Sequence, residues 1–97
     1  MLNDPTKTDP EKYKIVLENE LVRVLEYTDN PGEKTTLHHH PNAVTVSLTS
    51  FDRKLYSDGK EVVVHKKAGE VGWQAEQEHI GENIGSTPTH VILIELK

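Results

Sequence analysis

Three consecutive histidines, His38, His39 and His40, are the residues of this chain best suited to chemistry. Side chains two residues apart on a strand project from the same face. His38 and His40 would therefore point together, about 6.6 Å apart along the backbone, and His39 would point away. Two imidazoles placed in this way can converge on one metal ion. The triplet alone is equally compatible with a polar loop rich in imidazole.

The residues around this triplet predict strands that would position it. Val and Ile together number 15 and Thr nine, against three Ala, a balance that favours strands over helices. We expect little helix, and strands near 13–19, 21–29, 34–40, 43–49, 52–57, 61–66, 70–74, 78–83 and 89–96, separated by turn-forming residues. Eight or nine short antiparallel strands must hide their edges by closing or by stacking two sheets. The sequence therefore predicts an all-β, barrel-like double sheet.

Length and composition predict a single small domain. Of the 97 residues, we expect 1–12 to be a flexible or edge N-terminal segment, because it is polar and contains Pro5 and Pro10. Residues 13–97 would then form the β-barrel domain. A small all-β domain with Thr- and Val-rich outer strands has apolar surface to hide, so we expect a homodimer in which residues 1–20 pair with a partner's sheet edge.

Charge and cysteine content exclude several classes of protein. Acidic residues outnumber basic ones 16 to 11, and the net charge is −5, so nucleic acid and anionic membranes are poor partners. The longest apolar run, Val91–Ile94, is too short to cross a bilayer, and the N-terminus shows no signal peptide. We therefore expect a cytoplasmic protein. The absence of cysteine excludes disulfides and thiolate-based metal sites.

Two separated motifs resemble those of the cupin superfamily. In the first, a glycine at position 32 is followed after five residues by His38-x-His40. In the second, Gly69 precedes His79-x3-Asn83. The resemblance covers roughly residues 32 to 88. It implies the single-domain cupin fold, a double-stranded β-helix or jelly-roll barrel, with metal ligands at His38, His40 and His79.

The chain departs from the family pattern at the fourth ligand. The glutamate of the first cupin motif would fall at Val44 or Thr45, and neither is a carboxylate. In the second motif Ala75 stands where the family has proline, and the spacing from Gly69 to His79 is one residue short. The resemblance therefore implies a three-histidine variant whose fourth protein ligand is missing.

A divalent ion held by three neutral imidazoles keeps an open coordination position, as catalytic sites do. Imidazole suits several metals, so we expect a divalent transition metal such as iron, nickel, manganese or zinc. Its uncompensated charge should attract a small anionic molecule. Three-histidine cupins include dioxygenases, so one hypothesis is a metal-dependent oxidoreductase of that type. A non-catalytic binding or sensing cupin, and a metal-free isomerase or epimerase with a histidine base, are the alternatives, and no residue is assigned a catalytic role.

Four further side chains are candidates to line the pocket. Thr36 shares the predicted inward phase of the first two histidines, and Trp73 would either wall the pocket or pack in the core. Gln77, or its neighbour Glu76, could supply the missing oxygen ligand. Asn83 matches the asparagine of the second cupin motif, although asparagine also commonly satisfies turn backbone.

Overall fold

The structure, a computed structural model, describes residues 3–97 and confirms the all-β expectation. One short helix, α1 (Pro5–Thr8), is followed by nine strands: β1 (Tyr13–Glu18), β2 (Val22–Asp29), β3 (His38–His40), β4 (Ala43–Ser47), β5 (Phe51–Ser57), β6 (Lys60–Lys66), β7 (Val71–Gln74), β8 (Gln77–Asn83) and β9 (Thr89–Leu96). Each expected strand is present, but the one expected at 34–40 is confined to the three histidines. Within residues 3–97 no helix is long and apolar enough to cross a membrane.

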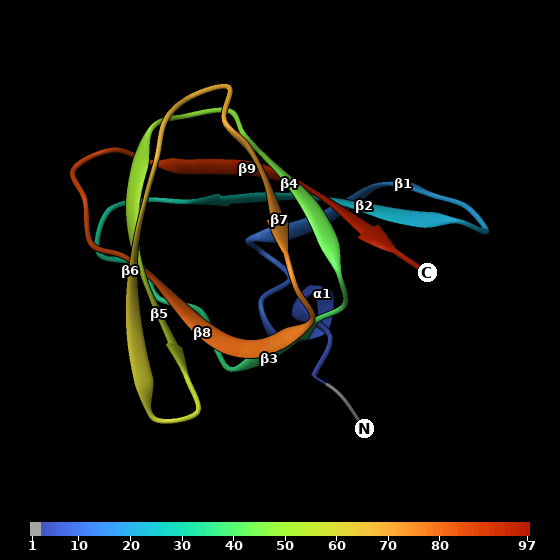
Figure 1. The fold of residues 1–97 in the computed structure, drawn as a ribbon, viewed down its shortest axis with the longest axis horizontal. Helices are drawn as coiled ribbons and strands as arrows, with labels where there is room; N and C mark the ends of the chain where they lie inside the picture. The colour runs from blue at the N-terminus through green and yellow to red at the C-terminus, as the bar shows by residue number, and fades with distance from the viewer. Residues whose placement is uncertain (1–2) are drawn as a thin grey trace.

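The strands form two antiparallel sheets that face each other as the walls of a jelly-roll barrel (Figure 1). One sheet has the order β1-β2-β9-β4-β7 and the other the order β3-β8-β5-β6. The hairpin of β1 and β2 extends beyond the barrel at one end (Figure 1). The short β3 pairs only with β8, so the histidine triplet lies at one edge of the smaller sheet.

The N-terminal residues within the described chain pack against this edge. Asp4 caps α1 by accepting a hydrogen bond from the Thr6 amide. Asp9, only 4% exposed, accepts hydrogen bonds from the backbone and the hydroxyl of Thr36. The His39 amide donates to the Asn3 carbonyl at 2.7 Å. Within the segment expected to be flexible or at an edge, Asn3 and α1 therefore contact β3, and Asp9 binds the residue two positions before β3. Residues 1 and 2 lie outside the described residues.

The barrel interior is more polar than apolar. Among residues 3–97, seven hydrophobic residues are buried, against eleven polar or charged ones. The apolar part is a small cluster that includes Leu25, Phe51 and Leu93. Strand alternation places Thr89 and Glu95 on the same buried face of β9 as Leu93. This share of buried polar groups exceeds what packing alone requires, which indicates a site inside the barrel.

The edge strand β1 leaves apolar side chains on the surface. Ile15 is 49% exposed, Leu17 52% and Leu21, in the turn that follows, 75%. These residues belong to the segment that we expect to pair with a partner's sheet edge. The homodimer itself stays a prediction.

Gly81 is the position where a small change should disturb the interior most. A methyl group at Gly81 would overlap the guanidinium of Arg53, which Asp29 and Tyr27 hold in place. We expect Gly81→Ala to lower the free energy of unfolding by about 1–3 kcal/mol, the usual cost of overpacking. Urea denaturation measures the change.

Gly72→Ala is the matched control, because its added methyl would meet the Thr45 hydroxyl at 3.3 Å and the movable Lys66 ammonium at 3.4 Å. We expect this control to cost less than half as much as Gly81→Ala. Equal losses in the two variants would contradict the steric explanation.

Candidate metal centre

Strand pairing brings three distant histidines together. His38 and His79 are direct partners across β3 and β8, where paired side chains lie closest. His40, two residues along β3, points to the same face. Their ring centroids are 4.6 to 5.1 Å apart, and one nitrogen of each ring lies within 4.8 Å of the others. All three side chains are buried, with at most 4% exposure.

Each of these imidazoles is oriented by an oxygen on its outer side. His38 Nδ1 donates to the Thr36 carbonyl at 2.8 Å. His40 Nδ1 donates to the Glu95 carboxylate at 3.3 Å. His79 Nδ1 donates to the side-chain oxygen of Gln77 at 2.7 Å.

These acceptors fix the tautomers of the three rings. An oxygen acceptor requires the proton to lie on Nδ1, so the Nε2 lone pair of each neutral ring is left for the interior. The same outer hydrogen bonds orient histidine ligands in metal sites. The donor set therefore fits a transition-metal ion.

Two carboxylates stand behind the histidines. Glu95, 2% exposed, bonds His40 with one oxygen and accepts from Arg23 with the other at 2.8 Å. Arg23 in turn binds both oxygens of Asp4. Asp9 lies 3.9 Å from His38 Nδ1. These two carboxylates would thus compensate part of the positive charge of a bound ion without being its ligands. The sequence did not predict this compensation.

Burial lowers the pKa of two of the three histidines. Loss of solvent, reinforced by the neighbouring His40, lowers the pKa of His38 from 6.5 to about 4. Loss of solvent and the two neighbouring imidazoles lower the pKa of His79 to about 3. Both rings are therefore neutral near pH 7, which is the form that ligates a metal.

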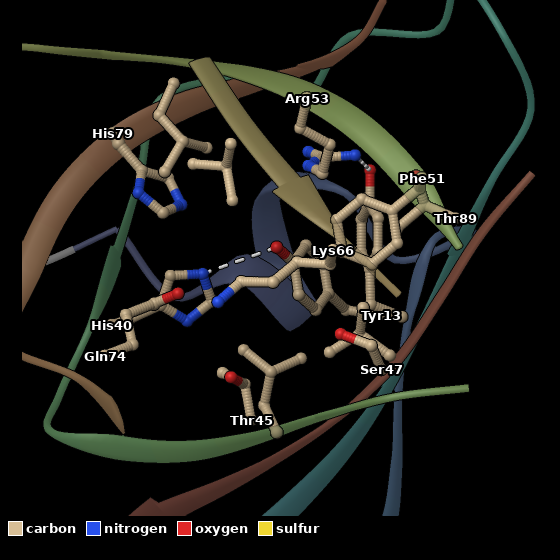
Figure 2. A pocket seen from close by; sticks show the side chains of 15 residues that line it. Tyr13, His40, Thr45, Ser47, Phe51, Arg53, Lys66, Gln74, His79 and Thr89 are labelled. Carbon is tan, nitrogen blue, oxygen red and sulfur yellow. Dashed lines mark hydrogen bonds between the residues drawn. The ribbon is translucent and has the colours of Figure 1, made fainter. Parts of the chain in front are cut away.

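A tyrosine hydroxyl reaches the same centre from the opposite sheet. Tyr13 Oη lies 3.2 Å from His38 Nε2 and 3.3 Å from His40 Nε2, and Figure 2 draws the second contact. The residue is 5% exposed. Burial is the main cause that raises the pKa of its hydroxyl well above the usual value, so the phenol keeps its proton when no cation is near.

A cavity of about 90 Å³ opens beside His40 and His79. Two cationic side chains, Arg53 and Lys66, line it (Figure 2), and among residues 3–97 no carboxylate does. Gln74 Nε2 and Thr89 Oγ1 also belong to its lining, and they are the two buried side-chain atoms of residues 3–97 that have no hydrogen-bond partner. Unpaired buried polar atoms on a cavity wall are suited to binding a polar ligand.

The cationic wall is held by a buried network. Asp29 accepts hydrogen bonds from Arg53, from the Tyr27 hydroxyl and from the Asn83 amide. Asn83 also donates to the Thr87 carbonyl at 2.9 Å. Asn83, 1% exposed, therefore holds the network and the turn after β8, the structural role that its residue type also suggested.

The structure corrects two of the four predicted pocket residues. Trp73 is 59% exposed, because alternation along the edge strand β7 turns Gly72 and Gln74 inward. Thr36 is also exposed, because the extended strand does not begin until His38, and its side chain binds Asp9. Thr36 reaches the site only through its backbone carbonyl.

The two candidates for the missing oxygen ligand lie outside the ring of nitrogens. Gln77 donates its amide nitrogen to the Ala75 carbonyl at 3.1 Å and holds the outer nitrogen of His79. Glu76 binds His39 on the surface at 2.8 Å. The sequence analysis missed the oxygen that does reach the centre, which belongs to Tyr13, and it missed Glu95 and Arg53.

Comparisons with known proteins agree on the fold. No protein-family model and no curated protein matches the chain. Among solved structures, a cupin domain from Bordetella pertussis Tohama I is 28% identical, with a TM-score of 0.81 over 88% of this chain and 91% of that one. An RmlC-like cupin from Methanocaldococcus jannaschii is 13% identical, with a TM-score of 0.69 over 87% and 77%.

A third similar structure is that of a predicted oxalate decarboxylase from Thermotoga maritima. It is 22% identical, with a TM-score of 0.54 over 95% of this chain and 74% of that one. At this identity the likeness extends to the fold alone.

The metal-free protein should lose stability as the pH falls from 6.5 to about 5. Unfolded histidine takes up a proton near pH 6.5, whereas the folded pKa is about 4 for His38 and about 3 for His79. The unfolded state therefore binds more protons in this window, so stability is complete above pH 6.5 and declines below it. Two such histidines predict a loss of about 3 kcal/mol, measured by urea denaturation with a chelator present.

A surface histidine provides the control for this titration. The His65 side chain is 71% exposed, so His65→Gln should leave the loss unchanged. His79→Gln should reduce it by about half, because one of the two buried imidazoles is gone. A wild-type free energy of unfolding that stays constant across this window would contradict the burial of two neutral histidines.

Proposed function

Because this chain belongs to the cupin superfamily, we propose that it binds a divalent transition-metal ion through His38, His40 and His79 and captures a small anion beside it. The observation that carries the proposal is the cluster of three buried imidazoles that offer one nitrogen each within 4.8 Å of one another, with an oxygen hydrogen-bonded to each Nδ1. When bound, the ion would supply Lewis acidity and an open coordination position.

The charges around the cavity support an anionic ligand. The carboxylates of Glu95 and Asp9 stand on the outer side of the histidines, whereas Arg53 and Lys66 face the cavity. An anion would therefore meet the positive charge of the ion at one end and, along the wall, the cationic groups of Arg53 and Lys66, which Asp29 and Glu70 also contact. The side-chain amide nitrogen of Gln74, which has no partner within residues 3–97, can donate a further hydrogen bond.

The volume of the cavity limits the size of that anion. A dry cavity of about 150 Å³ accommodates benzene, with six non-hydrogen atoms. The cavity here, at about 90 Å³, favours a carboxylate of two or three carbon atoms. Acetate and glycolate are of this size.

The three alternatives differ in what they require of the histidines. A metal-free isomerase needs a base with a pKa near the working pH, and the low pKa values of His38 and His79 make them poor bases at neutral pH. The three-imidazole donor set suits a dioxygenase-type reaction of the captured anion, which oxygen consumption by the iron-loaded protein tests. Anion binding without oxygen consumption would support the binding or sensing alternative.

Untagged protein exposed to iron, nickel, manganese or zinc and then desalted should retain about one ion per chain. His38→Ala and His79→Ala should lose it, because two imidazoles remain. His65→Ala, on the surface, should retain it. Elemental analysis measures the ratio, and a wild-type protein without stoichiometric metal would refute the proposed function.

The metal-loaded protein should bind acetate or glycolate, and Lys66→Gln should weaken that binding about tenfold by removing one charge-assisted contact. Lys60→Gln removes the same charge at an exposed position of β6 and should leave the affinity unchanged. Isothermal titration calorimetry measures both. Equal weakening in the two variants would show that net charge, not the cavity wall, attracts the anion.

A further inference from the structure

The Tyr13 hydroxyl stands where two histidine lone pairs already meet. Its oxygen is 3.2 Å from His38 Nε2 and 3.3 Å from His40 Nε2. Both separations lie at the long end of the hydrogen-bond range. They are ordinary separations for two donor atoms that share one cation.

The protons at this centre do not match the acceptors. The outer hydrogen bonds of His38 and His40 to oxygen place a proton on each Nδ1, and in that tautomer of a neutral ring Nε2 is an acceptor. The phenol of Tyr13 has one proton and can donate it to one nitrogen. A lone pair of the Tyr13 oxygen then faces the lone pair of the second Nε2 atom, with no proton between them. A cation bound by the Tyr13 oxygen and the two Nε2 atoms that it contacts would satisfy all three atoms.

Packing does not explain the hydroxyl. Tyr13 is the one buried residue of β1, and its ring lies 4.5 Å from that of its cross-strand partner Tyr27. The Tyr27 hydroxyl is bound by Asp29 and Arg53. Within the described residues, the Tyr13 hydroxyl has only the two imidazoles as partners. A phenylalanine would fill the same space without the cost of burying a polar group.

We propose that Tyr13 Oη is the fourth protein ligand of the ion held by His38, His40 and His79. The assignment rests on the proposed metal-binding function. It places an oxygen donor in the site although the sequence has Val44 or Thr45 where the cupin motif has its glutamate. The donor comes instead from the edge strand of the opposite sheet, and its phenolic proton passes to water when the oxygen ligates.

The spectrum of a ferric complex distinguishes this ligand from a bystander. The full chain is loaded with ferrous iron without oxygen, oxidised to the ferric state and desalted. A phenolate oxygen bound to ferric iron gives a visible charge-transfer band, and imidazole ligands alone do not. We expect the band in the wild-type protein, and we expect it to be absent from Tyr13→Phe. Tyr56→Phe should keep it, because that hydroxyl binds Glu82 on the outside.

Metal affinity provides the second measurement. Zinc binding by Tyr13→Phe should be at least about tenfold weaker than in the wild type, because even groups outside the ligand shell contribute 10–100-fold. Tyr56→Phe should match the wild type. The circular dichroism spectrum establishes that both variants are folded before their affinities are compared.

The outcomes separate this inference from the proposed function. A wild-type chain that binds neither iron nor zinc refutes both. A wild-type chain that binds iron without the visible band, or a Tyr13→Phe variant that binds zinc as tightly as the wild type, refutes the ligand assignment and leaves the three-histidine site standing. If Tyr13→Phe does not fold, the wild-type ferric spectrum alone decides, because a complex without the band contradicts the assignment.

Discussion

The burial of three imidazoles in contact with one another is the constraint on which the interior depends. His38, His40 and His79 each give their outer nitrogen a protein oxygen, and each leaves its inner nitrogen facing the other two. A buried acceptor without a donor costs about 1–3 kcal/mol, and the one phenolic proton of Tyr13 can serve only one of the two Nε2 atoms that its oxygen contacts. The arrangement is therefore unfavourable as packing and favourable as a preformed cation site.

The charges are separated across the histidines. Glu95 and Asp9 lie behind the imidazoles, where they hold ring orientation or add negative potential, and carboxylates in such positions raise the basicity of a histidine ligand. They compensate in part for a carboxylate missing from the ligand shell. The cavity side carries Arg53 instead. The carboxylates thus stabilise the ion, and the cationic side chain attracts a negatively charged ligand beside it. The two effects act on different sides of the histidines.

The sequence predicted the strands and the three histidines because both leave local signals. Period-two alternation, turn residues and two spaced motifs are properties of short segments. The missed groups leave no such signal. Tyr13 reaches the site from a strand at the far edge of the other sheet. Glu95 lies in a strand with apolar residues on both faces, so the sequence did not indicate which face points into the barrel. The side of the sheet on which Trp73 lies was also not predictable. In a four-residue edge strand, pairing with β4 decides which residues point inward.

Two ion pairs, Arg53 with Asp29 and the half-buried Arg23 with the buried Glu95, give a further reason to treat this interior as a site. Replacing a buried pair by well-packed apolar residues is often neutral or stabilising by about 1–4 kcal/mol, so stability does not explain why the chain keeps both. A domain of this size, with seven buried hydrophobic residues in its described part, would benefit from such a replacement. Each pair instead contacts the metal centre or the cavity. Glu95 binds both Arg23 and His40, and Arg53 lines the cavity together with His79. Because both pairs act on the same small volume, their retention is best explained by what that volume binds.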